Sequence, residues 1–378
     1  MNEPFISLIV LVKNAERTLD IMFDYLIKLD YPKEKMELIV ADGDSTDNTV
    51  AIIKKWQSQY PYIQIVHSPN SPSPGHARND ALKVAKGEII LFTDGDCAPN
   101  TDWVRLMLEP FFNDPQIGGV GGEVATLRIA PDSIVESYCE QTGFLSVKSR
   151  SGLTKEGYMD QLSDMSPSQA SAHRAPFFAT ANAAYLKAAI DKVGGFWDHP
   201  TGEDVGFSVD VQLAGYRLYF KPSAVVKHMH RITEEAFLFQ WFGYGQGHAF
   251  LVEKHATNHF ELVFQIFNGL PRIKIPSPKK GLVYIGNYHM IWIGAFLSIA
   301  SAVLTLLTQS KGLALFTIFA ILLLLHYLYR YFGGCFKMTP RSQWATWCKI
   351  RWQTNTSFIK GGLDGTKRTG ILYIEPSW

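Results

Sequence analysis

Two long apolar stretches near the C-terminus limit most what this chain can fold into. They run from Tyr288 to Leu307 and from Leu313 to Phe332, and only the short turn Thr308–Gly312 separates them. Each has roughly the 20 residues that a helix needs to cross a hydrocarbon layer about 30 Å thick. A pair of buried core helices is the alternative, but adjacent spans joined by a tight turn favour a membrane hairpin.

Basic residues flank both outer ends of this predicted hairpin, while the only acids from Arg272 onward are Asp364 and Glu375. By the positive-inside rule, the N-terminal part and the tail should both lie in the cytoplasm. Met1–Pro4 leads into a predicted strand without a signal peptide. We therefore expect a protein of the inner or plasma membrane with its main domain on the cytoplasmic side. The flanking basic residues are Arg272, Lys274, Lys279, Lys280, Arg330, Lys337, Arg341, Lys349 and Arg351.

The whole chain has 378 residues, and 47% of them are hydrophobic. The part outside the two apolar stretches is therefore long enough for a substantial globular body. The formal net charge is +1, and we expect no nucleic-acid partner. The four cysteines are far apart in sequence and form no Cys-x-x-Cys pair, so they indicate neither a zinc site nor a disulfide framework.

Strand and helix signals alternate through the first 120 or so residues, which predicts a parallel sheet covered on both faces. A polar segment from Ser146 to Arg174 is typical of a loop that closes over a site. Regular structure resumes over Phe177–Lys187, and Val225–Val226 is a last predicted strand. The earlier predicted elements are Phe5–Val12, Ala15–Leu29, Met36–Ala41, Asp47–Gln59, Ile63–His67, Ala77–Ala85 and Glu88–Phe92.

The sequence Asp94-Gly95-Asp96 follows the apolar run that ends at Phe92 and Thr93, so a buried strand should deliver two carboxylates to its C-terminal end. Ligands bind at that end of open α/β sheets. A surface turn is the alternative interpretation. Ionised Asp is seldom buried without a partner, however, and hard oxygen ligands suit Mg²⁺ or Mn²⁺ holding a diphosphate.

Other polar residues sit at similar positions. Asp42 is the first residue past a second apolar run, where it could accept hydrogen bonds from a base or ribose. Arg78 lies in the first turn of a predicted helix, against the usual dipole preference, which favours an anionic partner. Asp204 begins a further helix, and His228 and His230 should project to one face of the last strand.

Taken in order, these segments resemble the inverting family 2 glycosyltransferases, and the resemblance covers about residues 5 to 250. It implies an α/β GT-A fold, and the C-terminal apolar spans resemble members that build exopolysaccharide or lipid-linked glycans. The matching segments are Val10–Leu19 with Asn14, Asp42–Asp47, Gly75 with Ala77–Asn79, Asp94–Asp96, Ala181–Asn182, Gly194–Phe196 and Glu203–Asp204.

The resemblance also implies roles for single residues. Asp42 would bind the nucleotide base, Arg78 the donor diphosphate, and Asp94 the ribose or the metal. Asp96 would ligate Mn²⁺ or Mg²⁺, and His228 would be the third ligand, with His230 as the open alternative two residues away. Asp204 would be the general base. Val12, Asn14 and Gly95 complete the expected donor site, and Asn182, Glu203 and Trp241 the expected acceptor site.

The sequence departs from the family pattern in two regions, and these departures bear on the expected base preference and on the type of enzyme. Lys13 stands where many members carry an aromatic residue, and Asp42-Gly43-Asp44 replaces the usual Asp-Asp-Gly. Processive polysaccharide synthases carry Gln-x-x-Arg-Trp, whereas this chain has Gln240-Trp241-Phe242-Gly243-Tyr244 and only two strong spans. A processive synthase is therefore disfavoured.

The sequence thus predicts four parts: a GT-A domain over residues 1–232, amphipathic membrane-interface helices over 233–286, a transmembrane hairpin over 287–333, and a basic cytoplasmic tail with an interfacial helix over 334–378. The expected reaction transfers a sugar from a nucleotide-diphosphate donor, expected to be a UDP-sugar, to a hydroxyl of a polyprenyl-diphosphate-linked acceptor in the membrane. The alternatives are a polyprenyl-phosphate sugar synthase and a non-catalytic nucleotide-binding scaffold.

Overall fold

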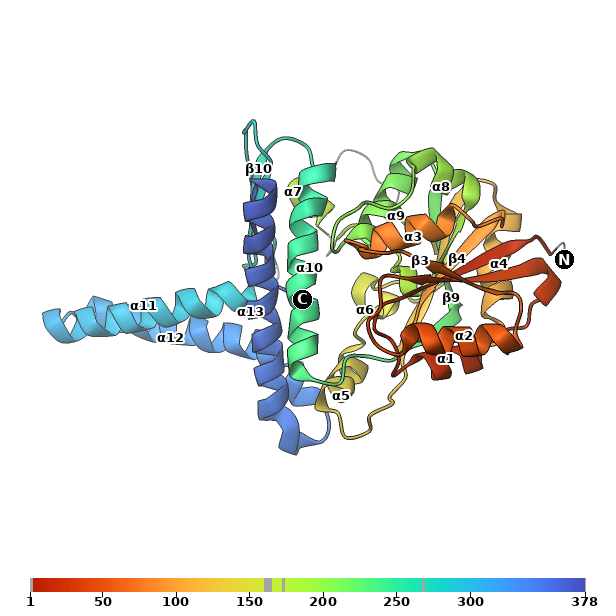
Figure 1. Cartoon of the computed structure of the whole chain (residues 1–378). Helices are drawn as coiled ribbons and strands as arrows, with labels where there is room; N and C mark the ends of the chain where they lie inside the picture. Colours follow the sequence, from red (N-terminus) through yellow and green to blue (C-terminus); the bar gives the residue numbers. More distant parts are fainter. Residues whose placement is uncertain (1–2, 160–164, 172–173, 267–268, 378) are drawn as a thin grey trace. The chain divides into compact units, whose positions relative to one another are not determined.

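The computed structural model describes residues 3–159, 165–171, 174–266 and 269–377. The chain divides into two compact units, which are treated separately below. The first comprises residues 1–165 and 172–233, and the second residues 166–171 and 234–378. Figure 1 shows their elements coloured along the sequence.

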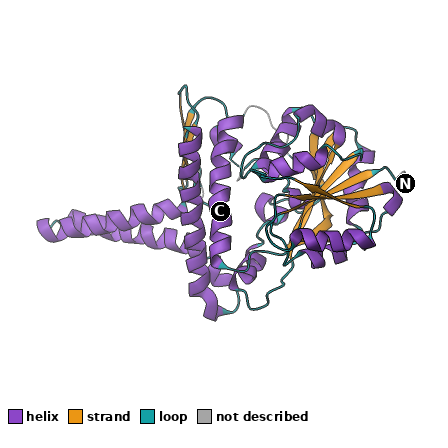
Figure 2. Ribbon diagram, viewed as in Figure 1, coloured by secondary structure: helices purple, strands orange, loops and turns teal. Residues whose placement is uncertain are grey.

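A nine-stranded sheet forms the centre of the first unit, with the order β3-β2-β1-β4-β8-β6-β9-β5 and β7 paired to β9 (Figure 2). The strands β1 to β4 run parallel to one another, as the alternation of strand and helix signals predicts. The strands are β1 Ile6–Val12, β2 Met36–Asp42, β3 Ile63–His67, β4 Ile89–Asp94, β5 Cys97–Pro99, β6 Ile117–Thr126, β7 Gly157–Tyr158, β8 Ala183–Leu186 and β9 Arg217–His228.

Helices cover both faces of this sheet. Alternate residues of β1 face opposite ways, so Leu8 packs in the cluster that contains Leu19, while Ile9 packs in the cluster that contains Phe207. The predicted doubly covered sheet is therefore present. The helices of this unit are α1 Leu19–Leu26, α2 Thr49–Gln59, α3 Pro74–Leu82, α4 Trp103–Asn113, α5 Ile134–Thr142, α6 Val147–Ser151, α8 Lys187–Val193 and α9 Glu203–Leu213, with the 3-10 turns η1 Lys33–Lys35 and η2 Thr180–Asn182.

The predicted loop from Ser146 to Arg174 is partly structured. It contains the short helix α6, the strand β7 and the helix α7 (Pro167–Ala170), while its residues 160–164 and 172–173 lie outside the described residues. Ser146 caps α6 by accepting a hydrogen bond from the backbone N–H of Ser149, at 3.1 Å. Local capping therefore gives this polar segment more order than its composition indicates.

In the second unit, the expectation of membrane-interface helices over 233–286 is wrong for its later half. One helix, α10 (Glu234–His255), is followed by strands that join β13 in a sheet of order β11-β10-β12-β13. Pro271, Pro276 and Pro278 cannot continue a helix, and the short runs before, between and after them contain β-branched and aromatic residues. These strands are β10 Phe260–Phe264, β11 Arg272–Ile275, β12 Gly281–Ile285 and β13 Leu372–Ile374.

Two long helices, α10 and α13 (Trp344–Thr369), pack side by side in this unit (Figure 1). Glycines bring their backbones together, because a Cβ added at Gly245 would lie 1.9 Å from the Phe358 carbonyl oxygen. In the same way, a Cβ at Gly361 would lie 1.9 Å from the Phe242 oxygen. The tail helix is thus present as predicted, and it is packed against α10. The 3-10 turns η3 Cys335–Lys337 and η4 Arg341–Gln343 precede it.

The two apolar stretches form helices α11 (Asn287–Thr308) and α12 (Lys311–Phe332), which lie side by side as a hairpin (Figure 1). Both are long and apolar enough to cross a membrane, by length and composition. Large side chains on both helices are exposed, among them Leu306 at 73% and Leu322 at 60%. This exposure disfavours the alternative of a pair of buried core helices.

Candidate active site

The C-terminal ends of β1, β2 and β4 lie next to one another in the sheet. In the strand register, Val12 is opposite Asp42 and Leu11 is opposite Asp94. Two carboxylates that are 52 positions apart in sequence are thus separated by one strand only. This is the edge at which the sequence predicts the donor site.

Asp42 lies at the β2 end of this site, and its side chain is fully buried. One carboxylate oxygen lies 2.7 Å from Nδ1 of His67, and the backbone N–H of Ser45 donates to the other at 3.2 Å. Asn14, in the loop that follows β1, accepts through its side-chain oxygen from the backbone N–H of Thr46 at 2.8 Å. These bonds fix the loops after β1 and β2 against each other.

Arg78, at the first turns of α3, is buried between two carboxylates. Its guanidinium donates to Glu203 Oε1 at 2.6 Å and to Asp94 Oδ1 at 3.1 Å, and the whole residue is 3% exposed. The resemblance implies that this arginine binds the donor diphosphate. In the structure its charge is matched by two acids of the protein, so it holds Asp94 and Glu203 together across the site.

Asp204 follows Glu203 in the first turn of α9, where Gly202 in the left-handed region (φ +81°) allows the sharp entry. Burial raises the pKa of Asp204 to about 7, the neighbouring Glu203 carboxylate adds to the effect, and Arg78 opposes it. Burial also raises the pKa of Asp94, again against Arg78. A carboxyl group whose pKa lies near neutrality can exchange a proton with a hydroxyl group at little cost.

A candidate metal centre lies at the other end of the Asp-x-Asp sequence. The Oδ1 atom of Asp96 is 3.3 Å from Nε2 of His228, and Cys97, which pairs with His228 in the β5–β9 ladder, places its sulfur 3.9 Å from the same oxygen. Ligand atoms of these three residues all lie within 4.8 Å of one another. Burial raises the pKa of the Cys97 thiol well above its usual range, so it stays a neutral donor to Asp96.

His230, the competitor of His228, has a different environment. Its ring stacks on His228 at a centroid distance of 4.9 Å, which confirms that both rings project to one side. Its Nε2 lies 2.9 Å from the Thr126 hydroxyl, and burial lowers its pKa to about 3. The geometry therefore favours His228 beside Asp96.

The three residues expected at the acceptor site all make structural contacts with other parts of the protein. Asn182 is 1% exposed, and its amide bonds to Trp103 and to the carbonyl oxygens of Glu123 and Ala224, which joins β6 to β9. Glu203 holds Arg78. Trp241 belongs to α10 in the second unit, where its ring meets Phe358. We therefore leave all three out of the acceptor site proposed below.

Sequence reasoning missed two residues next to the carboxylates. His67 ends β3 opposite Asp42, so the parallel register of neighbouring strand ends could have identified it. Cys97 was set aside because it has no cysteine partner in sequence. Its strand pairing with His228, 131 positions away, has no local signal.

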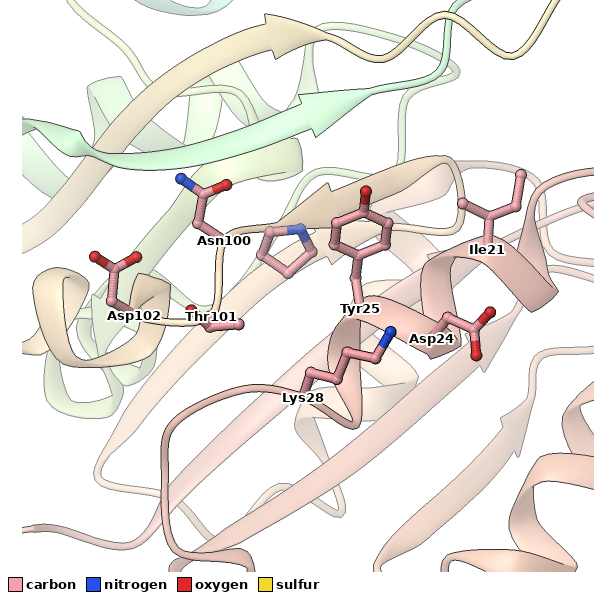
Figure 3. A pocket seen from close by; sticks show the side chains of 8 residues that line it. Ile21, Asp24, Tyr25, Lys28, Asn100, Thr101 and Asp102 are labelled. Carbon is pink, nitrogen blue, oxygen red and sulfur yellow. The ribbon is translucent and has the colours of Figure 1, made fainter.

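A pocket of about 650 Å³ lies outside this site, between α1 and the connection from β5 to α4 (Figure 3). Tyr25 of α1 and Lys28, two residues past its end, line one side of it, and Asn100 and Asp102 line the other. None of the predicted donor, metal or catalytic residues lines this pocket. It is therefore not the candidate active site.

Comparison with known proteins decides the family. The model for glycosyl transferase family 2 matches residues 7–143, and that for glycosyl transferase family group 2 matches residues 89–333. The chain belongs to the family 2 glycosyltransferases. Such enzymes transfer a sugar from a nucleotide donor, and this glycosyltransferase has the GT-A fold with the mixed α/β sheet described above.

Two archaeal relatives match most of this glycosyltransferase. One is the dolichyl N-acetyl-alpha-D-glucosaminyl phosphate 3-beta-D-2,3-diacetamido-2,3-dideoxy-beta-D-glucuronosyltransferase of Methanococcus voltae, which is 24% identical over 261 residues, or 67% of this chain and 76% of that protein. The other is the glycosyltransferase AglE of Haloferax volcanii, 24% identical over 282 residues, or 74% of this chain and 84% of that protein.

Among solved structures, the mannosyltransferase PcManGT from Pyrobaculum calidifontis, in complex with GDP-Man and Mn²⁺, is similar with a TM-score of 0.56 at 20% sequence identity. The match covers 96% of this chain and 88% of that one. At this identity the likeness confirms the fold.

Proposed function

We propose that this glycosyltransferase moves a sugar from a nucleotide-diphosphate donor, with a UDP-sugar as the expected donor, to a hydroxyl group of a lipid-linked glycan in the membrane. The observation that carries the proposal is that Arg78 bridges Asp94, at the end of β4, and Glu203, which places the adjacent Asp204 beside the strand ends of a GT-A sheet. Burial also raises the pKa of Asp204 to about 7. Asp204 can therefore act as the base that deprotonates the acceptor hydroxyl, next to the sheet edge where we expect the donor to bind.

In the proposed reaction, Asp204 accepts the proton of the acceptor hydroxyl as its oxygen bonds to the anomeric carbon. The bond from that carbon to the donor phosphate breaks on the opposite side, so one displacement inverts the anomeric configuration. Arg78 keeps Asp94 and Glu203 in place through its two ion pairs. Asp42 and Val12 lie at the adjacent strand ends, where the nucleoside would bind.

The residues present fit a divalent cation of the Mn²⁺ or Mg²⁺ type. Asp96 and His228 offer an oxygen and the ring nitrogen Nε2 3.3 Å apart, and Asp94 ends the preceding strand. Asp94, Asp96 and His228 would hold such an ion, which would stabilise the negative charge that develops on the leaving diphosphate. Mn²⁺ in the complex of the similar mannosyltransferase supports this choice.

Two observations support a lipid-linked acceptor. The Methanococcus voltae relative is named for a dolichyl-phosphate-linked substrate, and this chain carries the apolar hairpin α11–α12. A hairpin of this kind would keep the enzyme at the surface where such acceptors lie. We propose that the active site works on the cytoplasmic side, in line with the basic residues that flank the hairpin.

The test uses the detergent-solubilised full chain, Mn²⁺, a panel of radiolabelled nucleotide sugars, and a lipid extract that contains polyprenyl-linked glycans. Asp204→Asn should lower transfer by about 100-fold to 10,000-fold and leave donor binding intact. Asp191→Asn on α8, an exposed acid that pairs with Lys187, is the matched control.

Transfer by Asp204→Asn at the wild-type rate to a glycan hydroxyl would remove Asp204 from the base role. Retained transfer to a polyprenyl phosphate would instead identify a polyprenyl-phosphate sugar synthase, because an ionised phosphate needs no base. A wild-type chain that binds a nucleotide sugar and transfers none would be the non-catalytic scaffold.

A further inference from the structure

A half-buried arginine lies near the proposed general base without an acidic partner at contact distance. Arg150 is in the last turn of α6, and its guanidinium donates to the Phe177 carbonyl oxygen at 2.8 Å. The guanidinium carbon lies 3.9 Å from the centre of the Phe177 ring. Both contacts hold the side chain in a defined position.

The segment that Arg150 contacts runs along the same face of α9 as Asp204. The backbone N–H of Phe178 donates to the Ser208 hydroxyl at 3.2 Å, and the Gln212 amide donates to the Pro176 carbonyl oxygen at 2.9 Å. Asp204, Ser208 and Gln212 are spaced by four residues and so share one helix face. Arg150 is therefore anchored over the face that carries the base.

The charge of Arg150 is not neutralised by contact. Across the described ranges of the chain, no carboxylate lies within 4.0 Å of its guanidinium, and the side-chain oxygens of nearby Glu123 are taken by the Ser146 hydroxyl and the Lys148 backbone N–H. Burial lowers the pKa of Arg150 to about 10, and the more distant Asp204 and Glu123 act against this shift. A half-buried cation that has no ion-pair partner favours the binding of an anion beside it.

Arg78, the arginine expected to meet the donor diphosphate, already pairs with Glu203 through one terminal nitrogen and with Asp94 through the other. We propose that Arg150 binds a substrate diphosphate on the Asp204 side of the active site. The inference rests on the proposed function. Two substrates carry this group: the nucleotide donor and a polyprenyl-diphosphate-linked acceptor. The planar guanidinium suits either one, because it can bind two phosphate oxygens at once.

The experiment measures binding to the full chain in detergent with Mn²⁺. One arm compares the nucleoside diphosphate and monophosphate of whichever base, uracil or guanine, binds the wild-type chain more tightly. The other arm compares geranylgeranyl diphosphate with geranylgeranyl monophosphate. Arg150→Gln should weaken one diphosphate about 10-fold to 100-fold and the matching monophosphate much less. The arm that responds identifies the source.

Two further variants make the test specific. Lys148→Gln removes an equal charge from the exposed side of the same helix and should change neither arm. Arg150→Lys keeps the charge and loses the paired hydrogen bonds, so it should lose less diphosphate affinity than Arg150→Gln. It also replaces Arg150→Gln in the test if that variant does not fold.

Unchanged affinity for both diphosphates in Arg150→Gln and Arg150→Lys would overturn the proposal. That result would leave the proposed function standing, provided the wild-type chain transfers sugar and Asp204→Asn does not. If the wild-type chain transfers no sugar, that result would count against the proposed function alone. The two binding measurements do not depend on turnover.

Discussion

The carboxyl group of Asp204 owes its basicity to its surroundings. Burial and the neighbouring Glu203 raise its pKa to about 7, so a growing share of the enzyme carries a protonated, inactive carboxyl group as the pH falls below 7. We expect kcat at saturating donor and metal to fall about tenfold per pH unit on the acidic side. The measurement is a pH–rate profile between pH 5 and pH 9, and a flat profile across pH 7 would contradict the assignment.

Arg78 should matter for stability as well as activity, because it is buried between two acids. Replacement by Leu leaves Glu203 and Asp94 without their cation, and we expect it to lower the free energy of unfolding by about 3–5 kcal/mol. Arg105→Leu is the control, since that arginine pairs with Asp30 and Glu3 at a partly exposed position and should cost at most about 1 kcal/mol. Denaturant unfolding of both variants tests this. A weakened donor affinity with unchanged stability would instead show that Arg78 acts on the donor directly.

Residues that end predicted strands could be located from the sequence, and residues that act through tertiary contacts could not. Asp42 and Asp94 follow apolar runs, and parallel strands bring such ends together, so their neighbourhood was predictable. No local pattern indicates that Arg78 pairs with Glu203, 125 positions away. Arg150 was hidden for a similar reason, since it lies in a polar segment and its hydrogen bond to the Phe177 carbonyl oxygen spans 27 positions.

At the scale of elements, the close approach of α10 and α13 depends on small residues. Gly245→Ala would place a methyl group 1.9 Å from the Phe358 carbonyl oxygen, so the two backbones must separate. We expect a loss of about 1–3 kcal/mol in the stability of the second unit. Gly312→Ala, at the start of α12, where the nearest atom is 3.7 Å away, is the control. Thermal unfolding in detergent checks both, and equal melting temperatures would show that the contact is not tight.

The strands β1 to β4 were predictable because short apolar runs alternate there with helix-length segments. The strands β10 to β13 were not, because each has only 3 to 5 residues and is completed by partners far along the chain. The strand β12, for example, pairs with β13 some 90 positions later, where Gly281 is opposite Leu372. A short apolar run cannot reveal such a partner, and helix and strand remain ambiguous for it.

For the whole molecule, the hairpin should decide where the enzyme resides. Ile318 and Leu322 are one turn apart on α12 and are 56% and 60% exposed, so their side chains would face lipid. Each change to Lys should make the free energy of membrane insertion less favourable by about 2.5–3.5 kcal/mol. The double variant should therefore leave the membrane pellet that resists alkaline extraction. Leu363→Lys on α13, 41% exposed, should leave fractionation unchanged. Retention of the double variant in the pellet would show that the hairpin is not what anchors the chain.

A hairpin of two spans crosses a bilayer an even number of times. If α11 and α12 insert, the parts of the chain before Asn287 and after Phe332 face one compartment, and only the turn at Gln309 and Ser310 reaches the other. Reporters fused to either end should therefore give the same topological signal. A tag placed in that turn should give the opposite one, so the side on which sugar is transferred can be mapped without touching the catalytic unit.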